Sequence, residues 1–330
     1  MSNVVAIFDP SSGSANLGDQ IIVESCVKEI SRIAPETFFF MVSLHQPLTK
    51  KIRARIAQSD LAVVAGSNML NTRFNHQASL TRWRFGLRDS LDVNDVILMG
   101  VGWNRATDWI NPVGSYILRR GLSPRSLHSV RDQLTLEKAS RIGIGSVLNT
   151  SCPTLWQIGR QGDSPVEPKP IGKTAVATLT FNERAPQQDK YMLEFLAKRF
   201  GKVYFWPQGI GDLEYFQSLN PLGIFEALPG TLEAYDALLE ERGEIVYVGT
   251  RLHGGIRALQ KRRLALIVSV DHRAPGIAQS AGISTLSRSD IERLPELMEQ
   301  LTYPDVTLPE EGVLQWQEGI RHRLSQRMGV

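Results

Sequence analysis

The stretch Val246-Tyr-Val-Gly-Thr-Arg-Leu-His-Gly-Gly-Ile256 predicts a buried strand that turns directly into a helix. Its apolar first half is typical of a strand covered on both faces. Gly254 and Gly255 open the helix and let another group approach its backbone closely. A helix N-terminus presents unpaired N–H groups and the positive end of the helix dipole, so this turn favours an anionic ligand.

Alternation of strand and helix extends from this stretch over the whole chain. The apolar runs that predict strands are Val4–Phe8, Phe38–Val42, Leu61–Ala65, Val96–Met99, His128–Val130, Ala175–Leu179, Val203–Trp206, Ile245–Val248 and Leu264–Val268. Helical patterns lie between them, and two examples are the segments Gln20–Ala34 and Pro309–Met328. The second segment has an apolar stripe at helical spacing, formed by Val313, Trp316, Ile320, Leu324 and Met328. Such alternation favours parallel strands covered by helices on both sides, which is an α/β fold.

The periodicity lapses between Gly159 and Lys173, where Pro and Gly are frequent, so this stretch predicts an interdomain linker. We expect two Rossmann-like, doubly wound domains that face each other across a cleft. The predicted parts are an acceptor-side domain (1–160), a linker (161–172), a donor-binding domain (173–304) and a C-terminal helix (305–330) that packs back across the cleft. Ligands in open α/β sheets bind at the carboxyl ends of the strands, so we expect the chemistry in the cleft.

Composition excludes several classes of protein. The net charge of +3 is small and dispersed, so nucleic acid is not an expected partner. The chain has two cysteines, which form no metal or redox motif, and no metal site or cofactor is predicted. The sequence shows neither a signal peptide nor a run of about 20 apolar residues that would span a membrane. We therefore expect a soluble, cytoplasmic protein.

The turn at residues 249–255 carries side chains suited to anion chemistry. Arg251 provides a planar guanidinium that matches a phosphate or carboxylate, and His253 can supply a proton near neutral pH. Arg257 follows one helical turn after His253 and either adds positive charge or faces solvent. The alternative for the whole segment is a tight strand-to-helix turn in which Arg251 and His253 are incidental.

A second candidate is the loop from Asp9 to Gln20. Gly13 and Gly18 have the spacing of a phosphate-binding loop, but a carboxylate follows them where such loops have a lysine, and it would repel phosphate. The loop instead presents Asn16 and Asp19 at the start of a helix, where they suit neutral sugar hydroxyls. The alternative is that either residue simply caps the helix.

Weaker candidates also follow predicted strands. Arg131, in Ser129-Val-Arg-Asp132, either reaches the cleft or forms a salt bridge with a carboxylate such as Asp132. The segment Trp206-Pro-Gln-Gly-Ile-Gly-Asp212 either lines a donor pocket or is an ordinary turn. Two further loops are Gly66-Ser-Asn-Met-Leu70, which contains Asn68, and Gly100-Val-Gly-Trp-Asn104.

Taken together and in this order, these motifs resemble the polysaccharide pyruvyl transferase family over about Val4 to Leu301. The resemblance implies a glycosyltransferase-B-like fold, phosphoenolpyruvate as donor, and a glycan or lipid-linked oligosaccharide as acceptor. By motif position it implies that Arg251, Leu252 and His253 contact the donor and that Arg131 is a second cationic partner.

From this we expect a pyruvate ketal to form on sugar hydroxyls during exopolysaccharide or cell-surface polysaccharide biosynthesis. His253 is the expected general acid, and Asp19 is expected to orient or deprotonate the acceptor. Gly254 and Gly255 complete the donor site, while Asn16, Asn68 and Asn104 join Asp19 at the acceptor. A lipid-linked acceptor would bring the protein into peripheral contact with a membrane. Two alternatives are a glycosyltransferase that uses a nucleotide sugar and a non-catalytic glycan-binding protein.

Overall fold

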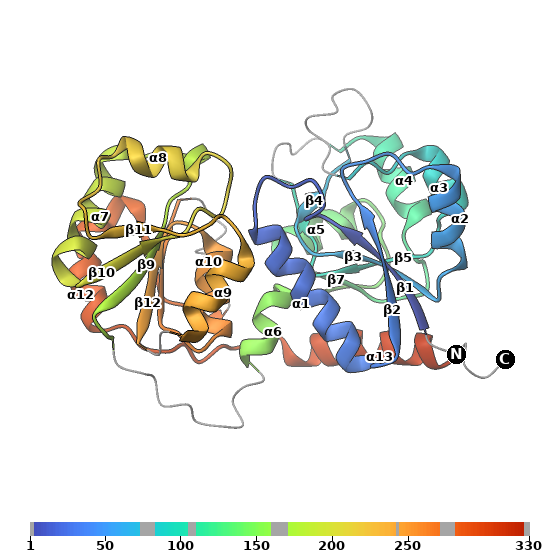
Figure 1. The fold of residues 1–330 in the computed structure, drawn as a ribbon. Coiled ribbons are helices and arrows are strands. Elements are labelled where there is room, and N and C mark those ends of the chain that lie inside the picture. The colour runs from blue at the N-terminus through green and yellow to red at the C-terminus, as the bar shows by residue number, and fades with distance from the viewer. Residues whose placement is uncertain are drawn as a thin grey trace. The chain divides into compact units, whose positions relative to one another are not determined.

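The computed structural model describes residues 3–72, 83–104, 110–159, 171–241, 244–270 and 281–326. The chain divides into two compact units, each built around a parallel sheet (Figure 1). Unit 1 consists of Met1–Ser14, Ile22–Pro153 and Leu308–Val330, and unit 2 consists of Ala15–Ile21 and Thr154–Thr307. The start of the first helix therefore groups with unit 2, and the last helix groups with unit 1.

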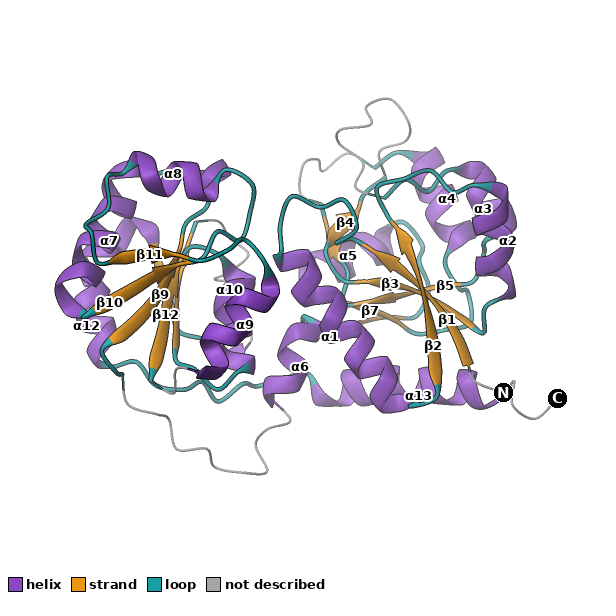
Figure 2. Ribbon diagram, in the orientation of Figure 1, coloured by secondary structure: helices purple, strands orange, loops and turns teal. Residues whose placement is uncertain are grey.

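Unit 1 alternates strands and helices as the sequence predicts (Figure 2). Its elements are β1 (Asn3–Asp9), α1 (Gly18–Ile33, whose first turn belongs to unit 2), β2 (Thr37–Ser43), α2 (Lys50–Gln58), β3 (Leu61–Ala65), β4 (Asn68–Leu70), α3 (Leu87–Asp92), β5 (Val96–Met99), β6 (Gly102–Trp103), α4 (Pro112–Gly121), β7 (His128–Val130), α5 (Gln133–Arg141), β8 (Val147–Asn149) and α13 (Glu310–Gln326). The main sheet has the order β2-β1-β3-β5, and its neighbouring strands run parallel.

The sheet of unit 1 is buried on both faces. On one face, Phe8, Val64 and Leu98 belong to a core cluster that includes Ile56 of α2 and Leu118 of α4. Because side chains alternate along a strand, their neighbours point to the opposite face, which α1 and α13 cover (Figure 1). Parallel strands form such sheets only when helices shield both sides, which explains the continuous apolar runs in the sequence.

Helix α13 is part of the core of unit 1. Its predicted stripe is buried: Val313, Trp316, Ile320 and Leu324 are each at most 5% exposed. The Trp316 indole donates a hydrogen bond from Nε1 to the carbonyl of Leu98 at 3.1 Å. Nε2 of Gln317 donates to Oε1 of Glu29 in α1 at 2.9 Å. These contacts tie the last described helix to both β5 and α1.

Unit 2 contains a parallel sheet with the order β11-β10-β9-β12-β13-β14. Its elements are β9 (Thr174–Thr178), η2 (Phe181–Glu183), α7 (Pro186–Arg199), β10 (Lys202–Phe205), α8 (Asp212–Ser218), β11 (Phe225–Ala227), α9 (Leu232–Glu241), β12 (Ile245–Gly249), α10 (Leu252–Gln260), β13 (Ala265–Ser269), β14 (Thr285–Ser287), η3 (Arg288–Arg293) and α12 (Leu294–Glu299). Helix α6 (Pro153–Gly159) begins at the boundary between the units.

The strand order of unit 2 identifies where a ligand would bind. From β9 the chain proceeds to β10 and β11 on one side, whereas β12, β13 and β14 lie on the other side. Open α/β sheets bind ligands outside the carboxyl ends of their strands at such a reversal. The loops that follow β9 and β12 meet there, and they carry Thr180 and Arg251.

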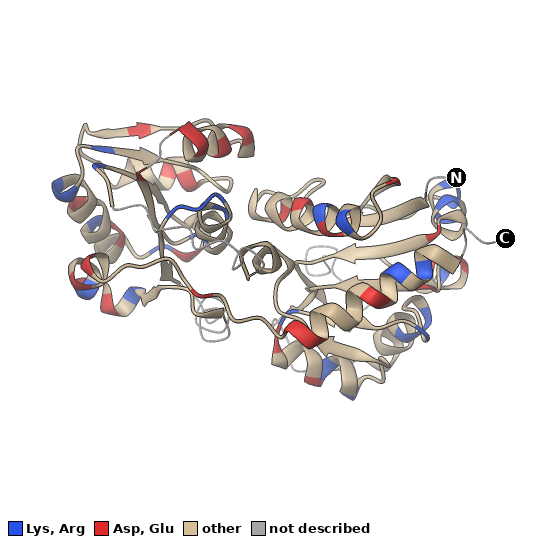
Figure 3. Cartoon of the chain, turned by 90° about the horizontal axis from the view of Figure 1, so that it is seen from below, with Lys and Arg blue, Asp and Glu red and all other residues tan. Residues whose placement is uncertain are grey.

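The predicted doubly wound α/β fold is confirmed, and so are the nine predicted strands, within one residue at each end. Short elements such as β4, β6, β8 and α8 were not predicted, because two to seven residues are too few to show a period. The predicted linker 161–172 lies almost wholly outside the described residues. Basic and acidic residues are interspersed along the helices and strands of both units (Figure 3). Among the described helices, none is both long and apolar enough to cross a bilayer.

Candidate active site at the start of helix α10

The turn between β12 and α10 is fixed to the neighbouring strand β9. The hydroxyl of Thr178 accepts the backbone N–H of Arg251 at 3.2 Å and shares a hydrogen bond of 2.6 Å with the hydroxyl of Tyr247. That tyrosine donates in turn to the carbonyl of Arg251 at 2.6 Å. Burial raises the pKa of Tyr247 well above its usual value, although its hydrogen bonds oppose the shift, so it stays a donor at any ordinary pH. The backbone of Arg251 is thus held on both sides.

The guanidinium of Arg251 forms a buried ion pair with Asp212. Nε lies 2.9 Å from Oδ2 of Asp212, and Nη2 contacts Oδ1. Asp212 has no exposed surface, and its carboxylate also accepts the backbone N–H groups of Phe181 and Gly209. Nε of Arg251 additionally donates to the carbonyl of Leu179 at 3.2 Å. Three hydrogen bonds therefore fix Nε and Nη2 of the arginine, while Nη1 donates to no described residue.

Gly209 allows this packing. A Cβ at position 209 would lie 2.3 Å from Nη2 of Arg251, which is closer than two such atoms can approach. Any larger residue would therefore push the arginine away from Asp212.

Helix α10 begins without a side-chain cap. Its N-cap residue is Arg251, whose side chain makes no capping hydrogen bond. The first N–H groups of a helix have no partner within the helix, and those of Leu252 and Gly254 have no acceptor among the described residues. His253 lies in the same first turn and is 9% exposed. Open N–H groups, the helix dipole and Nη1 of Arg251 together suit an anion.

The segment Ala15–Leu17 pairs with Gln208–Ile210. The N–H of Leu17 donates to the carbonyl of Gln208 at 2.8 Å, and the N–H of Ile210 donates to that of Ala15 at 3.0 Å. Oδ1 of Asn16 accepts the N–H of Gly18 at 3.1 Å and Nε2 of Gln208 at 2.8 Å. Asn16 thus makes the capping contact named above as its alternative role, and the same oxygen also joins it to Gln208. Asp19 is 7% exposed and lies in the first turn of α1.

Other predicted site residues lie in unit 1. Arg131 is 7% exposed, and its Nε lies 3.4 Å from Oδ2 of Asp132, which is the salt bridge offered above as an alternative. A Cβ on Gly102 would lie 2.3 Å from Oδ1 of Asn68 and 2.5 Å from Nε of Arg131. Unit 1 therefore brings Arg131 and Asn68 together around Gly102. Asn104 directly follows β6, and its N–H donates to the carbonyl of Leu70 at 2.7 Å. That Arg131 and Arg251 share one anion stays a prediction.

One expectation needs correction. Arg257 does not face solvent: it is 3% exposed and forms an ion pair with Asp236, so its charge is already matched. Conversely, the sequence named Asp212 and Gln208 only within a segment that either lines a donor pocket or is an ordinary turn, and it assigned no role to Thr178. The first two were visible only as polar residues among glycines after a buried strand.

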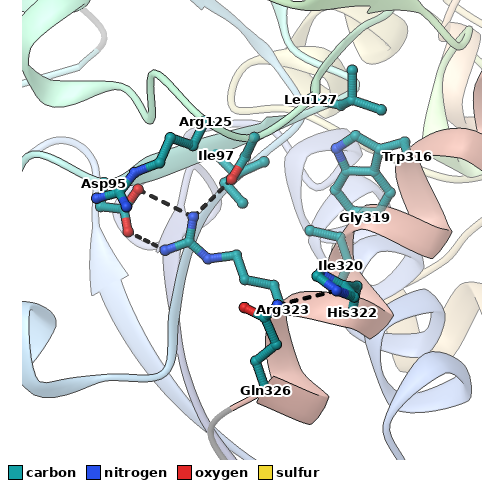
Figure 4. A pocket seen from close by; sticks show the side chains of 11 residues that line it. Asp95, Ile97, Arg125, Leu127, Trp316, Gly319, Ile320, His322, Arg323 and Gln326 are labelled. Carbon is teal, nitrogen blue, oxygen red and sulfur yellow. Dashed lines mark hydrogen bonds and ion pairs between the residues drawn. The ribbon is translucent and has the colours of Figure 1, made fainter.

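A cavity of about 470 Å³ in unit 1 does not have the position of an α/β ligand site. It lies beside Asp95, directly before β5, at the amino end of the strands rather than the carboxyl end. In Figure 4 the guanidinium of Arg323 from α13 points to the Asp95 carboxylate, and Trp316 lines another wall. Arg323 also donates to Oγ of Ser126 at 2.7 Å. We interpret these contacts as an anchor for α13.

We expect the contribution of the Asp95–Arg323 ion pair to the free energy of unfolding to depend on pH. Burial alone would raise the pKa of Asp95, but hydrogen bonds from Arg323 and Ser123 bring it below its usual value. A lowered pKa in the folded state contributes stability above the unfolded value of about 3.9 and loses it as the pH falls through the folded value. Asp95→Asn should therefore lower the urea midpoint at pH 7, and lower it by less at pH 2.5.

The control is Glu318→Gln, because Glu318 pairs with Arg321 on the same helix and both side chains are largely exposed. It should leave the midpoint unchanged at both pH values. An Asp95→Asn deficit of the same size at pH 2.5 would contradict the anchor.

Among the residues that the structure describes, no group of three or more His, Cys, Asp or Glu side chains could hold a metal ion.

Solved structures of other proteins share this fold over nearly the whole chain. One is UDP-GlcNAc 2-epimerase from Methanocaldococcus jannaschii, with a TM-score of 0.53, 9% identity and coverage of 98% of both chains. Another is MnaA from S. aureus in a structure with UDP, with a TM-score of 0.53, 12% identity and coverage of 94% of this chain and 92% of that one. At this identity the likeness shows the fold alone. It confirms the predicted glycosyltransferase-B-like architecture.

No curated protein matches the sequence. A match to a protein family, however, covers residues 16–185, just over half of the chain. The matched region starts at Asn16 and includes the predicted motifs around Asn68, Gly102 and Arg131. The family is described as polysaccharide pyruvyl transferase. By this match over half its length, and with the glycosyltransferase-B-like fold, the chain belongs to the polysaccharide pyruvyl transferase family.

Proposed function

We propose that this protein transfers pyruvate from phosphoenolpyruvate to sugar hydroxyls of a glycan and forms a cyclic ketal. The observation that carries the proposal is the start of α10, where uncapped N–H groups lie beside a buried and immobilised arginine in a member of this family. This arrangement suits a small, highly charged donor.

Phosphoenolpyruvate carries its charge on a phosphate and a carboxylate, so its site needs more than one cationic anchor. Arg251 offers Nη1 while Asp212 fixes its other edge, so little rotational entropy is lost when it binds an anion. The N–H groups of Leu252 and Gly254 add donors at the same place. We assign the second charged anchor to Arg131.

The chemistry requires an acid and a base. His253 donates a proton to the methylene carbon of phosphoenolpyruvate, which leaves an oxocarbenium-like centre at the adjacent carbon. A sugar hydroxyl attacks that centre and loses its proton, with Asp19 as the proposed base. The carbon–oxygen bond to phosphate then breaks, inorganic phosphate leaves, and a second hydroxyl closes the ketal. One phosphoenolpyruvate and two sugar hydroxyls thus give one ketal and one phosphate.

The acceptor side is proposed to use Asn16, Asn68 and Asn104 in addition to Asp19. Neutral amides and one carboxylate suit sugar hydroxyls, which both donate and accept hydrogen bonds. We place the reaction in the cytoplasm, in exopolysaccharide or cell-surface polysaccharide biosynthesis. A lipid-linked acceptor would be reached by peripheral contact with the membrane.

The direct test is turnover. The protein is incubated with phosphoenolpyruvate and a panel of p-nitrophenyl galactosides and mannosides, and released phosphate is measured. We expect phosphate to appear only when both substrates are present. The product should have the mass of the sugar plus one pyruvate less one water.

A binding measurement tests the donor without an acceptor. Phosphoenolpyruvate at about 100 times its Kd should stabilise the fold by about 2.7 kcal/mol and raise the melting temperature. UDP-GlcNAc and GDP-mannose serve as comparison ligands. Stabilisation by a nucleotide sugar, with none by phosphoenolpyruvate, would favour a glycosyltransferase and overturn the proposal.

A further inference from the structure

Gln208 lies between two segments that the proposed function assigns to different substrates. It contacts Asn16, which is 192 positions away in the sequence and lies in the segment Ala15–Leu17, called the acceptor loop below. The other segment is helix α10, called the donor helix below. Gln208 also contacts the first turn of α10, because a Cβ on Gly254 would lie 3.0 Å from its Oε1. The residue is 2% exposed, and these contacts all lie within unit 2.

The orientation of the Gln208 amide follows from a backbone donor. The N–H of Gly18 can only donate, so Asn16 must present its oxygen to it. Since Nε2 of Gln208 contacts that same oxygen, Gln208 must place its nitrogen toward Asn16 and its oxygen toward α10. A flipped amide would oppose two oxygens.

The backbone around Gln208 reinforces this arrangement. The hydrogen bonds Leu17 N–H to Gln208 carbonyl and Ile210 N–H to Ala15 carbonyl flank the side-chain contact. The next residue, Gly209, lies against Arg251, with Nη2 only 2.3 Å from the position of a Cβ. Residues 208 and 209 therefore touch the acceptor loop on one side and the donor helix on the other.

Gln208 is a poor choice for stability alone. Its Oε1 is buried and has no hydrogen-bond partner among the described residues. A buried acceptor without a partner is destabilising, so an apolar side chain of similar length would suit the fold as well or better. A role in function explains why an amide occupies this position.

We propose that Gln208 is a positioning residue that sets the distance and orientation of the acceptor loop relative to the donor helix. It acts through Asn16 and does not itself need to touch either substrate. The inference rests on the proposed pyruvyl transfer, because it gives the two segments to acceptor and donor.

The test combines kinetics with a double-mutant cycle. Gln208→Met keeps the length of the side chain and removes both polar atoms. Asn16→Ser keeps an oxygen that can cap α1 but is too short to reach Gln208. Each variant, and the double variant, is assayed with phosphoenolpyruvate and whichever p-nitrophenyl galactoside or mannoside the wild type turns over.

For Gln208→Met we expect kcat/KM for the sugar to fall about 10–100-fold, since small misplacements of reacting groups have effects of this size. The Kd for phosphoenolpyruvate should change by less than about twofold, and the melting temperature should be equal or higher. The double variant should be no worse than the poorer single variant, because both break one contact. Gln217→Met, on the exposed face of α8, is the matched control and should behave as wild type.

The outcomes separate the two proposals. If the wild type turns over and Gln208→Met has the same kcat/KM for the sugar as the wild type, the positioning role is overturned and pyruvyl transfer stays intact. Losses that multiply in the double variant would also overturn it, because the two residues would then act independently. A wild type that neither binds phosphoenolpyruvate nor releases phosphate would overturn the proposed function and this inference with it.

Discussion

Asp212→Asn should lower the free energy of unfolding by about 3–5 kcal/mol, because it leaves the Arg251 guanidinium without its counter-charge in a site that is nearly closed to solvent. Oδ1 of Asp212 accepts Nη2 of Arg251 and the N–H of Phe181, whereas Oδ2 accepts Nε of Arg251 and the N–H of Gly209. An asparagine would place its NH₂ group at one of these two positions, so it would face two donors and lose both hydrogen bonds whichever way it turned. Urea unfolding followed by circular dichroism measures the effect.

Replacing the whole ion pair separates folding from function. Arg251→Met with Asp212→Leu should recover much of the lost stability, since apolar residues of similar volume can substitute for a buried pair. It should nevertheless raise the KM for phosphoenolpyruvate about 10–100-fold, the size expected when a charge-assisted hydrogen bond is lost. Recovery of both stability and KM would show that Arg251 only supports the turn.

Helix α10 provides the matched control. Arg257 is buried on the same helix and forms an ion pair with Asp236, as Arg251 does with Asp212. Arg257→Met with Asp236→Leu should change stability in a similar way. It should leave the KM for phosphoenolpyruvate unchanged, because this pair lies away from the helix start.

His253→Gln should lower kcat by about 10²–10⁴-fold, which is the usual contribution of a general acid. Glutamine can still donate a hydrogen bond but cannot deliver a proton at neutral pH. Donor binding, measured by the thermal shift with phosphoenolpyruvate, should be largely kept. The rate is measured as phosphate release per folded molecule.

The control is the same substitution at His128, a histidine with a structural role. Its Nδ1 accepts the N–H of Leu98, and its Nε2 contacts the carbonyl of Ser123 at 2.9 Å. Burial lowers its pKa, which keeps the ring neutral and able to accept. His128→Gln should lower the melting temperature and leave kcat per folded molecule within a few-fold. If His253→Gln gives that same pattern, His253 is not the acid.

The sequence predicted the strands well because parallel strands buried on both faces leave unbroken apolar runs such as Leu61–Ala65. It predicted the last helix from the stripe through Trp316 for a similar reason. It could not show that this helix completes unit 1, because periodicity reports that a face is buried but not which sheet buries it. Nor could it show that Ala15–Ile21 groups with unit 2.

At the site, the sequence predicted a residue's role correctly where that role depends only on neighbouring positions in the chain. The glycines after β12 predicted a helix start open to a ligand, and the structure has an uncapped helix there. The partner of Arg251 was not predictable, since Asp212 is 39 positions away and was one of many carboxylates. Arg257 shows the converse: a guanidinium one turn from His253 suggested extra positive charge, yet a buried ion pair removes it.

The return of α13 to unit 1 affects the order in which the protein folds during synthesis. Residues 154–307, the bulk of unit 2, leave the ribosome before Glu310–Gln326. Domains tend to fold as units while they emerge. The part of the unit 1 sheet that α13 covers, including the place of Trp316, therefore stays open until unit 2 has been made. In this chain the nascent N-terminal part is the later one to mature, and chaperones would meet it with the apolar surface under α13 uncovered.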